Sequence, residues 1–215
     1  EAYLVDDDLD IVQNPNERDF NQRFVVFDIE TTGFSVTGDN ITEIGAVLLE
    51  DGQIKDRFST FVNPRMDIPY EVQELTNITN DMVKNAKPFA EAIDEILDYI
   101  KDDVLVAHNA TFDYFFLNEE LRRIGRKPLT NVVIDTLDMS RAVLPDRRAY
   151  RLGNLSRYYH VNYNEEEAHR ADFDAGALAD VFLKSWKEVG LDVKLVDGKL
   201  MSPKDFSQRV QADDP

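Results

Sequence analysis

The order of the apolar segments is the feature that most constrains how this chain can fold. Three β-rich runs come first, at residues 24–29, 41–49 and 54–62. Residues 50–52, Glu-Asp-Gly, join the last two runs, and an acidic residue followed by glycine is typical of a tight hairpin turn. The sequence therefore predicts an antiparallel meander of three strands.

After the meander, the pattern changes to strands that alternate with helices. Short buried strands are predicted at residues 104–107 and 132–134. Apolar residues recur at helical spacing from 79 to 100, with Pro88 suited to a helix start, and the same spacing recurs at 111–124, 137–143, 152–159 and 171–189. This alternation predicts an α/β fold in which helices flank a mixed sheet, with parallel strands added to the antiparallel meander.

The length of 215 residues suits a single domain with a full core and some extra segments. We place this domain at residues 24–190. The flanks, 1–23 and 191–215, are polar at their ends and the first residue is Glu1 rather than methionine, so we expect both flanks to connect to a longer parent chain. Short apolar runs in each flank would suit a small hairpin.

Composition excludes several classes of protein. The chain has no cysteine, which removes disulfides, thiol nucleophiles and cysteine zinc sites, and three histidines are too few for the usual ligand sets of zinc hydrolases. No apolar run approaches the ~20 residues of a membrane span, and no signal peptide is visible. We expect a soluble, cytoplasmic protein that does not contact a membrane.

The net charge is −18, and it is distributed unevenly along the chain. Residues 1–19 hold seven acidic side chains and one basic side chain, which disfavours contact of this stretch with nucleic acid. Residues 122–157 hold nine basic side chains and three acidic ones. This second stretch is either a phosphate-facing surface or an ordinary solvated face of a helix and a loop.

Two acidic residues stand at the end of the first predicted strand. Asp28 and Glu30 come after the apolar run 24–27, and a period of two places both side chains on one face of a strand. Side-by-side carboxylates repel each other unless a cation neutralises them. Hard divalent ions such as Mg²⁺ prefer oxygen ligands and are often shared between carboxylates and a substrate phosphate. The buried pair thus indicates a metal site, although an isolated Asp-x-Glu pair is usually only solvated.

Two further acidic residues fall near predicted helix starts. Asp113 follows the strand at 104–107 by a few residues, and ligands of α/β sheets gather at this carboxyl edge. Asp174 lies in the first turns of the last helix. His169 is five residues earlier, or ~140° around a continuous helix, so we expect it in the preceding loop, free to swing toward the site. Asp172 points away from Asp174 on the same helix and is not counted as a ligand.

Each of these residues also has a purely structural explanation. Asp113 alone could be a charge that favours the helix macrodipole. His108 is better explained as a hydrogen-bonded histidine at a strand end than as a ligand, and His160 as a helix-end residue. Residues 165–167, three glutamates, are expected in a solvated loop. The joint occurrence of the acids and His169 in this order is what favours a catalytic site.

Three short motifs follow one another along the chain: Asp-Ile-Glu-Thr-Thr-Gly at 28–33, His-Asn-Ala-Thr-Phe-Asp at 108–113 and His-Arg-Ala-Asp-Phe-Asp at 169–174. Together they resemble the exonuclease motifs of the DEDDh superfamily, and the resemblance covers about residues 24–189. It implies a ribonuclease H-like fold and 3′-to-5′ exonuclease activity. The sister DEDDy group has tyrosine four residues before the last aspartate, where this chain has Arg170, so the histidine subtype is favoured.

Within the superfamily the chain is similar to the proofreading exonucleases of PolC-type bacterial DNA polymerase III, which are inserted in a polymerase chain. The stretches that carry this similarity are 1–7, 75–79 and 133–137. Phe34 departs from the family pattern, which usually has leucine, but both side chains are apolar. The similarity implies a single-stranded or frayed DNA 3′ end as substrate, with polymerase parts of the parent chain and replisome proteins as partners.

The resemblance also implies roles for the residues of the site, under a two-metal mechanism with Mg²⁺ or Mn²⁺. Asp28, Glu30 and Asp174 would hold one ion, and Asp28 with Asp113 would hold the second, ~3.5 to 4 Å away. His169 would act as general base on the attacking water, because a histidine with a pKa near ~6.5 accepts a proton at neutral pH. The implied substrate-binding residues, whose aromatic rings would stack or wedge against bases, are Thr31, Thr32, Phe34, Asn109 and Phe112.

Two other functions are left open by the sequence. The first is an exonuclease of the same superfamily that trims RNA, with the same site residues and a different substrate. The second is a catalytically silent module whose fold connects the parts of a polymerase.

Overall fold

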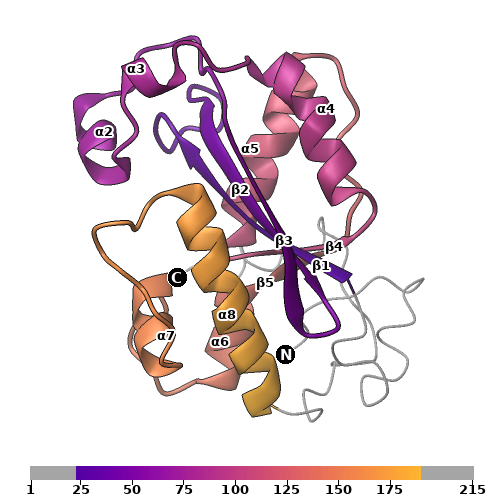
Figure 1. Cartoon of the computed structure of the whole chain (residues 1–215), viewed down its shortest axis with the longest axis vertical. Coiled ribbons are helices and arrows are strands. Elements are labelled where there is room, and N and C mark those ends of the chain that lie inside the picture. The colour runs from indigo at the N-terminus through magenta and orange to yellow at the C-terminus, as the bar shows by residue number, and fades with distance from the viewer. Residues whose placement is uncertain (1–22, 190–215) are drawn as a thin grey trace.

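The computed structural model describes residues 23–189, except for the side chains of 142 and 186–189. Its strands are β1 (Arg23–Thr31), β2 (Ile41–Glu50), β3 (Gln53–Phe61), β4 (Val104–Ala107) and β5 (Val133–Asp135). They form one sheet in the order β3-β2-β1-β4-β5 (Figure 1). The pairs β1–β2 and β2–β3 are antiparallel, whereas β1–β4 and β4–β5 are parallel. The predicted mixed sheet with an antiparallel meander is confirmed. The hairpins suggested for the flanks lie outside the described residues.

The turn between β2 and β3 explains how the meander closes. Asp51 and Gly52 both have positive φ, at 54° and 73°. Two consecutive left-handed residues are what a two-residue hairpin turn requires, since this turn follows the right-handed twist of the strands. The acid-glycine pair in the sequence therefore marks the turn correctly.

The helices are α2 (Tyr70–Thr76), α3 (Asn80–Val83), α4 (Phe89–Ile100), α5 (Ala110–Arg123), α6 (Thr136–Val143), α7 (Leu152–Tyr158) and α8 (Ala171–Val189). Those from α4 onward occupy the segments that the apolar spacing predicts, and Pro88 precedes α4 as its N-cap. The helical pattern assigned to 79–88 was wrong, because this segment holds only the single turn of α3 and an irregular stretch. α2 was missed, because Tyr70 and Leu75 are exposed and leave no apolar stripe for the sequence to reveal.

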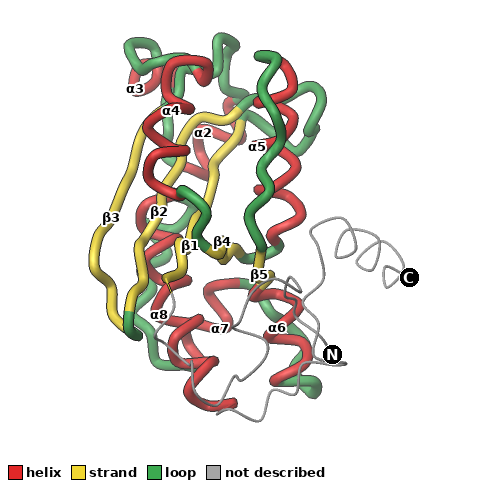
Figure 2. Tube along the Cα trace, turned by 90° about the vertical axis from the view of Figure 1, so that its right-hand side faces the viewer, coloured by secondary structure: helices red, strands yellow, loops and turns green. Residues whose placement is uncertain are grey.

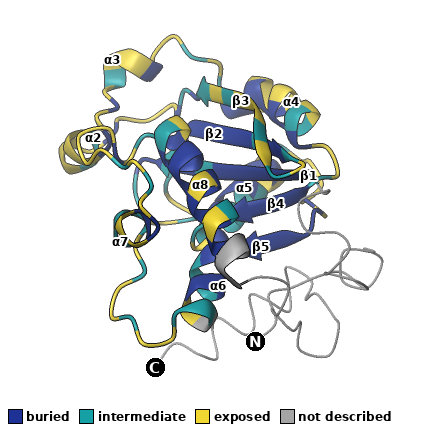
Figure 3. Cartoon of the chain, turned by 60° about the horizontal axis from the view of Figure 1, so that its bottom comes forward, coloured by how far each residue is buried: buried dark blue, intermediate teal, exposed yellow. Residues whose placement is uncertain are grey.

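The helices cover the sheet on both faces, as Figures 1 and 2 show. α8 and α6 pack on one face, where Phe182 and Met139 join the even-numbered residues Phe24 and Val26 of β1 in one core. α4 and α5 pack on the other face against the odd-numbered residues of β1. Figure 3 shows the buried central strands beneath helices whose outer faces are exposed. Because strand residues alternate in direction, Asp28 and Glu30 belong to the α8 face.

None of the described helices combines the length and the apolar character needed to cross a membrane. The helices instead have one buried and one exposed face, as in α4, whose buried side chains are Phe89, Ala92, Ile93, Ile96 and Ile100. Most buried apolar residues of the described chain belong to the two cores on either face of the sheet, and smaller clusters form around Ile78 and Leu155.

The start of α8 lies unusually close to β2. A Cβ atom placed on Gly45 would lie 2.3 Å from the backbone carbon and oxygen of Ala171 and 2.4 Å from the nitrogen of Asp172. Only a residue without a side chain fits at this crossing. Gly45 therefore determines how closely the first turn of α8, with Asp174, approaches the end of β1.

We predict that Gly45→Ala lowers the free energy of unfolding by about 3 kcal/mol, because the new methyl group collides with rigid backbone atoms. Gly125→Ala is the control, since Gly125 has a φ of +74° and no atom within 4 Å of its added Cβ. The control should cost only about 1 kcal/mol, through backbone strain alone. Urea unfolding of both variants tests the prediction, which equal losses would contradict.

Candidate functional site

The predicted acidic residues meet where the parallel strands end. Asp28 and Glu30 lie near the carboxyl end of β1, and α5, which begins soon after the neighbouring β4, carries Asp113 in its first turn. Asp174 lies in the first turn of α8, which packs on the face of the sheet that carries Asp28 and Glu30. Segments distant in sequence thus bring four carboxylates to one edge of the sheet.

Asp113 is joined to the end of β1 by a hydrogen bond. It is 3% exposed, and its Oδ1 accepts a hydrogen bond of 3.1 Å from the backbone N–H of Ile29, the residue between Asp28 and Glu30. This contact joins the start of α5 to the end of β1. The position of the third carboxylate relative to the first two is therefore set by the backbone rather than by a flexible side chain.

His169 lies at the surface, next to Asp174. It ends the turn before α8 with a φ of 62°, and its backbone N–H donates to Oδ2 of Asp174 over 3.1 Å. Ligand atoms of Glu30, His169 and Asp174 lie within 4.8 Å of one another, which is close enough to share a metal ion. The loop position predicted for His169 is confirmed. Asp172 is exposed and stays outside the group.

The carboxylates are crowded and short of compensating partners. Burial, and then the charges of Glu30, Asp113 and Asp174, raise the pKa of Asp28 well above its usual value. The pKa of Glu30 is raised to about 9, first by burial and then by Asp174, and burial raises the pKa of Asp174 to about 7. Oδ2 of Asp28 is buried without a hydrogen-bond partner among the described residues. The negative charge of this group is not compensated by the part of the chain that the structure describes, and a bound divalent cation would neutralise it.

Hydrogen bonds between its own residues hold the turn after β1 in shape. Thr32 is fully buried, its N–H donates to the carbonyl of Asn40, and its hydroxyl donates to Asp39. The polar groups of Thr32 are thus used to shape the turn. Phe34, in contrast, is 82% exposed, and its ring lies 6.4 Å from the ring of Phe112 on α5. The two predicted aromatic residues therefore lie together, Phe34 after the end of β1 and Phe112 next to Asp113 in α5, with the Phe34 ring turned to solvent.

Asp135 was not expected at the site, yet it positions the start of α5. Its carboxylate accepts hydrogen bonds from the backbone N–H groups of Asn109 (3.0 Å), Ala110 (3.1 Å) and Leu137 (2.8 Å). Burial raises its pKa to about 6. Asn109 has a left-handed φ of 60° and is exposed at the N-cap of α5. The sequence signal for Asp135 was its place as an acid between a strand and a helix, where helix caps are common.

His108 is a hydrogen-bonded histidine at the end of β4, as the sequence suggested. Its Nε2 donates to the carbonyl of Tyr150 over 2.7 Å, and its Nδ1 lies 2.9 Å from the hydroxyl of Thr136. Burial lowers its pKa to about 4, against a smaller opposing effect of the Tyr150 carbonyl. The neutral imidazole thus ties the loop before α7 to the edge of the sheet that carries the site.

Glu43 and Arg170 form an ion pair beside the carboxylates. Glu43 is 1% exposed and accepts from the guanidinium of Arg170 over 3.0 and 3.1 Å and from the N–H of Ala171 over 3.1 Å. Arg170 also lies over the ring of Phe61, 5.2 Å from its centroid. Arg170 stands at the position that distinguishes the histidine and tyrosine subgroups, and its side chain contacts Glu43 of β2 and Phe61 of β3. The sequence signal for Glu43 was a charge inside an apolar strand.

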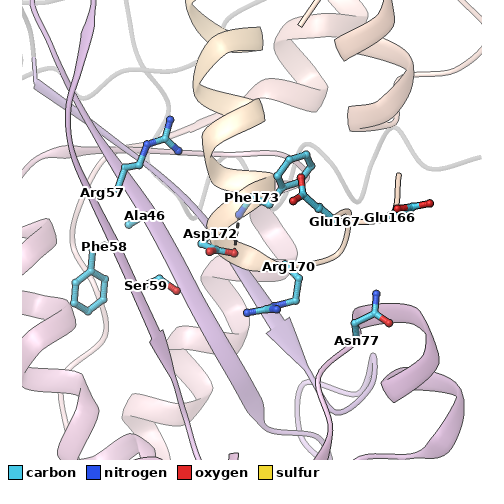
Figure 4. A pocket seen from close by; sticks show the side chains of 10 residues that line it. All are labelled: Ala46, Arg57, Phe58, Ser59, Asn77, Glu166, Glu167, Arg170, Asp172 and Phe173. Carbon is cyan, nitrogen blue, oxygen red and sulfur yellow. Dashed lines mark hydrogen bonds between the residues drawn. The ribbon is translucent and has the colours of Figure 1, made fainter. Parts of the chain in front are cut away.

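A pocket of about 500 Å³ adjoins this ion pair (Figure 4). Its lining combines the basic Arg57 and Arg170 with the acidic Glu166, Glu167 and Asp172. None of the four clustered carboxylates lines it. The pocket therefore neighbours the candidate site without being part of it.

The basic stretch 122–157 divides into two parts. In the first part, Arg122 and Arg123 pair with Glu119, and Arg126 pairs with Asp94. Of the two alternatives for this stretch, the first part is therefore a solvated face rather than a phosphate-facing surface. In the second part, the exposed Arg148 and Arg151 make no ion pair with another described residue. They flank Tyr150, whose carbonyl binds His108, and so lie near the carboxyl edge of the sheet.

Comparison with known proteins assigns the family. The model of the family described as Exonuclease (RNase_T) matches residues 25–182. The chain belongs to this exonuclease family. The predicted exonuclease is therefore confirmed, while the outer boundaries proposed for the domain and the roles of single site residues stay predictions.

Two curated relatives of this exonuclease are PolC-type DNA polymerases III. The chain is 42% identical to that of Clostridium perfringens over 207 residues and 36% identical to that of Staphylococcus haemolyticus over 218 residues. These alignments cover 96% and 100% of the chain but 14% of each relative. The exonuclease is thus homologous to a segment of these much longer polymerases.

Solved structures share the fold of this exonuclease. Exonuclease X in complex with 5′-overhanging duplex DNA aligns with a TM-score of 0.66 and 24% identity, covering 81% of this chain and 98% of its own. The nuclease domain of 3′hExo, described as a DEDDh family member bound to rAMP, aligns with a TM-score of 0.70 and 19% identity, covering 82% and 96%. The predicted ribonuclease H-like fold is confirmed.

We predict that Arg170→Met lowers the free energy of unfolding by about 3 kcal/mol, because it leaves the Glu43 carboxylate buried without its counter-charge. In a Glu43→Gln background the same replacement should cost about 1 kcal/mol, since no charge is left stranded. A double-mutant cycle by urea unfolding measures this difference. Equal costs in both backgrounds would show that the pair contributes no coupling energy.

The lowered pKa of His108 predicts a stability that depends on pH. The unfolded chain takes up a proton near pH 6.5 and the folded chain only near pH 4, so the contribution of His108 is complete above 6.5 and is lost as the pH falls to 4. The difference in unfolding free energy between the wild type and His108→Gln should change by about 3 kcal/mol between pH 7 and pH 4. Because the carboxylates titrate in both proteins, this difference isolates His108. A constant difference would refute the prediction.

Proposed function

We propose that this exonuclease removes nucleotides from the 3′ ends of DNA and proofreads for a PolC-type DNA polymerase III. The observation that carries the proposal is the meeting of four carboxylates and His169 at one edge of the sheet, in a chain of the exonuclease family. Homology to PolC-type polymerases over nearly the whole chain supports the polymerase context. The substrate is then a single-stranded or frayed DNA end.

Two divalent cations, Mg²⁺ or Mn²⁺, fit this group of residues. The donors are hard carboxylate oxygens, the charges of Glu30, Asp113 and Asp174 add to burial in raising the pKa of Asp28, and Oδ2 of Asp28 has no partner among the described residues. Asp28, Glu30 and Asp174 would hold one ion, and Asp28 with Asp113 the other. When bound, such ions stabilise the attacking and leaving oxygens of phosphodiester hydrolysis.

His169 is the proposed general base. Its exposure on the turn before α8 lets its ring reach an attacking water, and burial of part of the ring lowers its pKa below the usual value. The imidazole is then neutral at physiological pH and accepts the proton of that water. Its backbone N–H, bonded to Asp174, keeps the histidine beside the carboxylates during this transfer.

The DNA end would be bound by aromatic and basic side chains around the carboxylates. Phe34 and Phe112 offer stacking surfaces that accept any base, which suits a frayed end of arbitrary sequence. Thr31, Thr32 and Asn109 would shape the pocket for the terminal nucleotide. Arg148 and Arg151 make no ion pair with described residues, and their positive charges would attract the phosphates of the DNA nucleotides that precede the 3′ end.

An exonuclease that trims RNA is the second candidate function. It is supported by the fold that the chain shares with a DEDDh nuclease bound to rAMP. The higher identity to PolC-type DNA polymerases favours DNA. Release of nucleotides from matched DNA and RNA oligonucleotides of one sequence separates the two functions, and a clear preference for RNA would overturn our proposal. Nucleotide release from either oligonucleotide also tests directly against the catalytically silent module that the sequence alone left open.

We predict that Asp174→Asn reduces nucleotide release by at least about 100-fold, because it removes one of the charges that hold the ions. Asp172→Asn is the matched control on the same helix, since Asp172 is exposed and outside the group. The assay follows shortening of a single-stranded DNA, labelled at its 5′ end, with and without Mg²⁺ or Mn²⁺. Wild-type activity in Asp174→Asn, or an equal loss in the control, would contradict the assignment.

A further inference from the structure

Tyr163 brings a hydroxyl group into the carboxylate site from a part of the chain that no motif covers. It lies in the loop between α7 and α8, and its hydroxyl is 3.5 Å from Oδ1 of Asp174. This is a long hydrogen bond, of the kind that shortens in active sites when the reacting groups are bound. Burial, and then the charges of Asp174, Asp28 and Glu30, raise the pKa of this hydroxyl, which is consistent with its place beside Asp174.

The ring of Tyr163 has two packing contacts. It packs against Phe173, with 5.5 Å between ring centroids. It also lies against Gly153 of α7, where an added Cβ would lie 3.2 Å from Cε1 of the tyrosine. The absence of a side chain at Gly153 thus makes room for the ring. The direction of the hydroxyl follows from packing rather than from a chance rotamer of an exposed side chain.

As a result, each carboxylate oxygen of Asp174 has its own hydrogen-bond donor. The Tyr163 hydroxyl lies at Oδ1, and the backbone N–H of His169 donates to Oδ2. With a donor at each oxygen, the carboxylate has one preferred rotation about its terminal bond. A carboxylate with a fixed rotation presents its remaining lone pairs in one direction, and ligand atoms of Glu30 and His169 lie within 4.8 Å of it.

We propose that Tyr163 is a positioning residue that orients the Asp174 carboxylate for cation binding. This inference rests on the proposed function, in which Asp174 is a metal ligand. Partners that hydrogen-bond a ligating carboxylate typically contribute 10- to 100-fold in metal affinity or activity. Tyr163 differs from the tyrosine of the sister subgroup, whose place in this chain is taken by Arg170, bound to Glu43.

We predict that Tyr163→Phe weakens Mn²⁺ binding about 10-fold and leaves thermal stability unchanged, because the ring packing is kept and only the hydroxyl is lost. Free Mn²⁺ is measured by electron paramagnetic resonance during titration of the whole chain, without substrate. The Mg²⁺ concentration for half-maximal nucleotide release should rise by the same factor. An affinity within about twofold of the wild type would overturn the proposal, whatever happens to stability.

Tyr114→Phe is the control for the loss of a hydroxyl elsewhere in the fold. The hydroxyl of Tyr114 donates to the carbonyl of Leu129 over 2.8 Å, away from the carboxylates. This variant should lose about 1 kcal/mol of stability and keep wild-type Mn²⁺ affinity. If it weakened Mn²⁺ binding as much as Tyr163→Phe does, general destabilisation would explain both results and the positioning role would be refuted.

Gly153→Ala provides a second, independent variant. It keeps the Tyr163 hydroxyl but pushes the ring by a few tenths of an ångström, and we expect a smaller loss of Mn²⁺ affinity in the same direction. In the double variant Gly153→Ala with Tyr163→Phe, the affinity should equal that of Tyr163→Phe alone, since no hydroxyl is left to misplace. Additive losses would overturn the proposal.

Failure of the proposed function and failure of this inference give different results. A wild-type chain that neither binds Mn²⁺ nor releases nucleotides would refute the function itself, and the role of Tyr163 with it. A wild-type chain that does both, together with an unchanged Tyr163→Phe variant, would refute only the role of Tyr163.

Discussion

The ion pair between the buried Glu43 and Arg170 is the interaction on which the rest of the site depends. Glu43 lies on β2 opposite Glu30 and receives the guanidinium of Arg170 and the N–H of Ala171. The first turn of α8 is thereby fixed to the sheet, at a crossing so close that only Gly45 fits beneath it. Asp174 and His169 follow from this junction, because they stand three residues after and two residues before Ala171. The ion pair and the close crossing over Gly45 together set the distance between the acids of β1 and Asp174 of α8.

The same edge of the sheet concentrates negative charge that the fold does not neutralise. Arg170 compensates Glu43, but Asp28, Glu30, Asp113 and Asp174 have no comparable cation among the described residues. Burial raises the pKa of all four carboxyl groups, and neighbouring acidic side chains raise it further. Crowding of this kind opposes folding of the metal-free chain and favours uptake of divalent cations. Surrounding donors hold the carboxylates in place against this repulsion. Ile29 bonds Asp113, His169 and Tyr163 bond Asp174, and Asp135 anchors the start of α5.

Much of the fold could be predicted from the sequence, because the patterns that indicate strands, turns and helices involve residues close to one another along the chain. Alternation in β1, the Asp51-Gly52 turn and the apolar stripe of α4 each depend on residues a few positions apart. α2 could not be read, since Tyr70 and Leu75 are exposed and give it no stripe. At the site, the motif residues were found, but the partners that orient them were not. Glu43, Asp135 and Tyr163 act across the sheet or between loops, and spacing along the chain carries no information about such contacts.

By itself, the sequence determined the identity of the chemical groups and the elements that carry them. Two acids on one strand face, an acid in each of two helix starts and a histidine in a loop follow from periods of 2 and 3.6 residues. Only the tertiary structure decided that these groups converge, that Arg170 turns to Glu43 and not to the site, and which bases of 122–157 are already paired. The physical reason is that convergence depends on the docking of α8 and α5 on the sheet. That docking is fixed by packing and buried hydrogen bonds between residues as much as 128 positions apart.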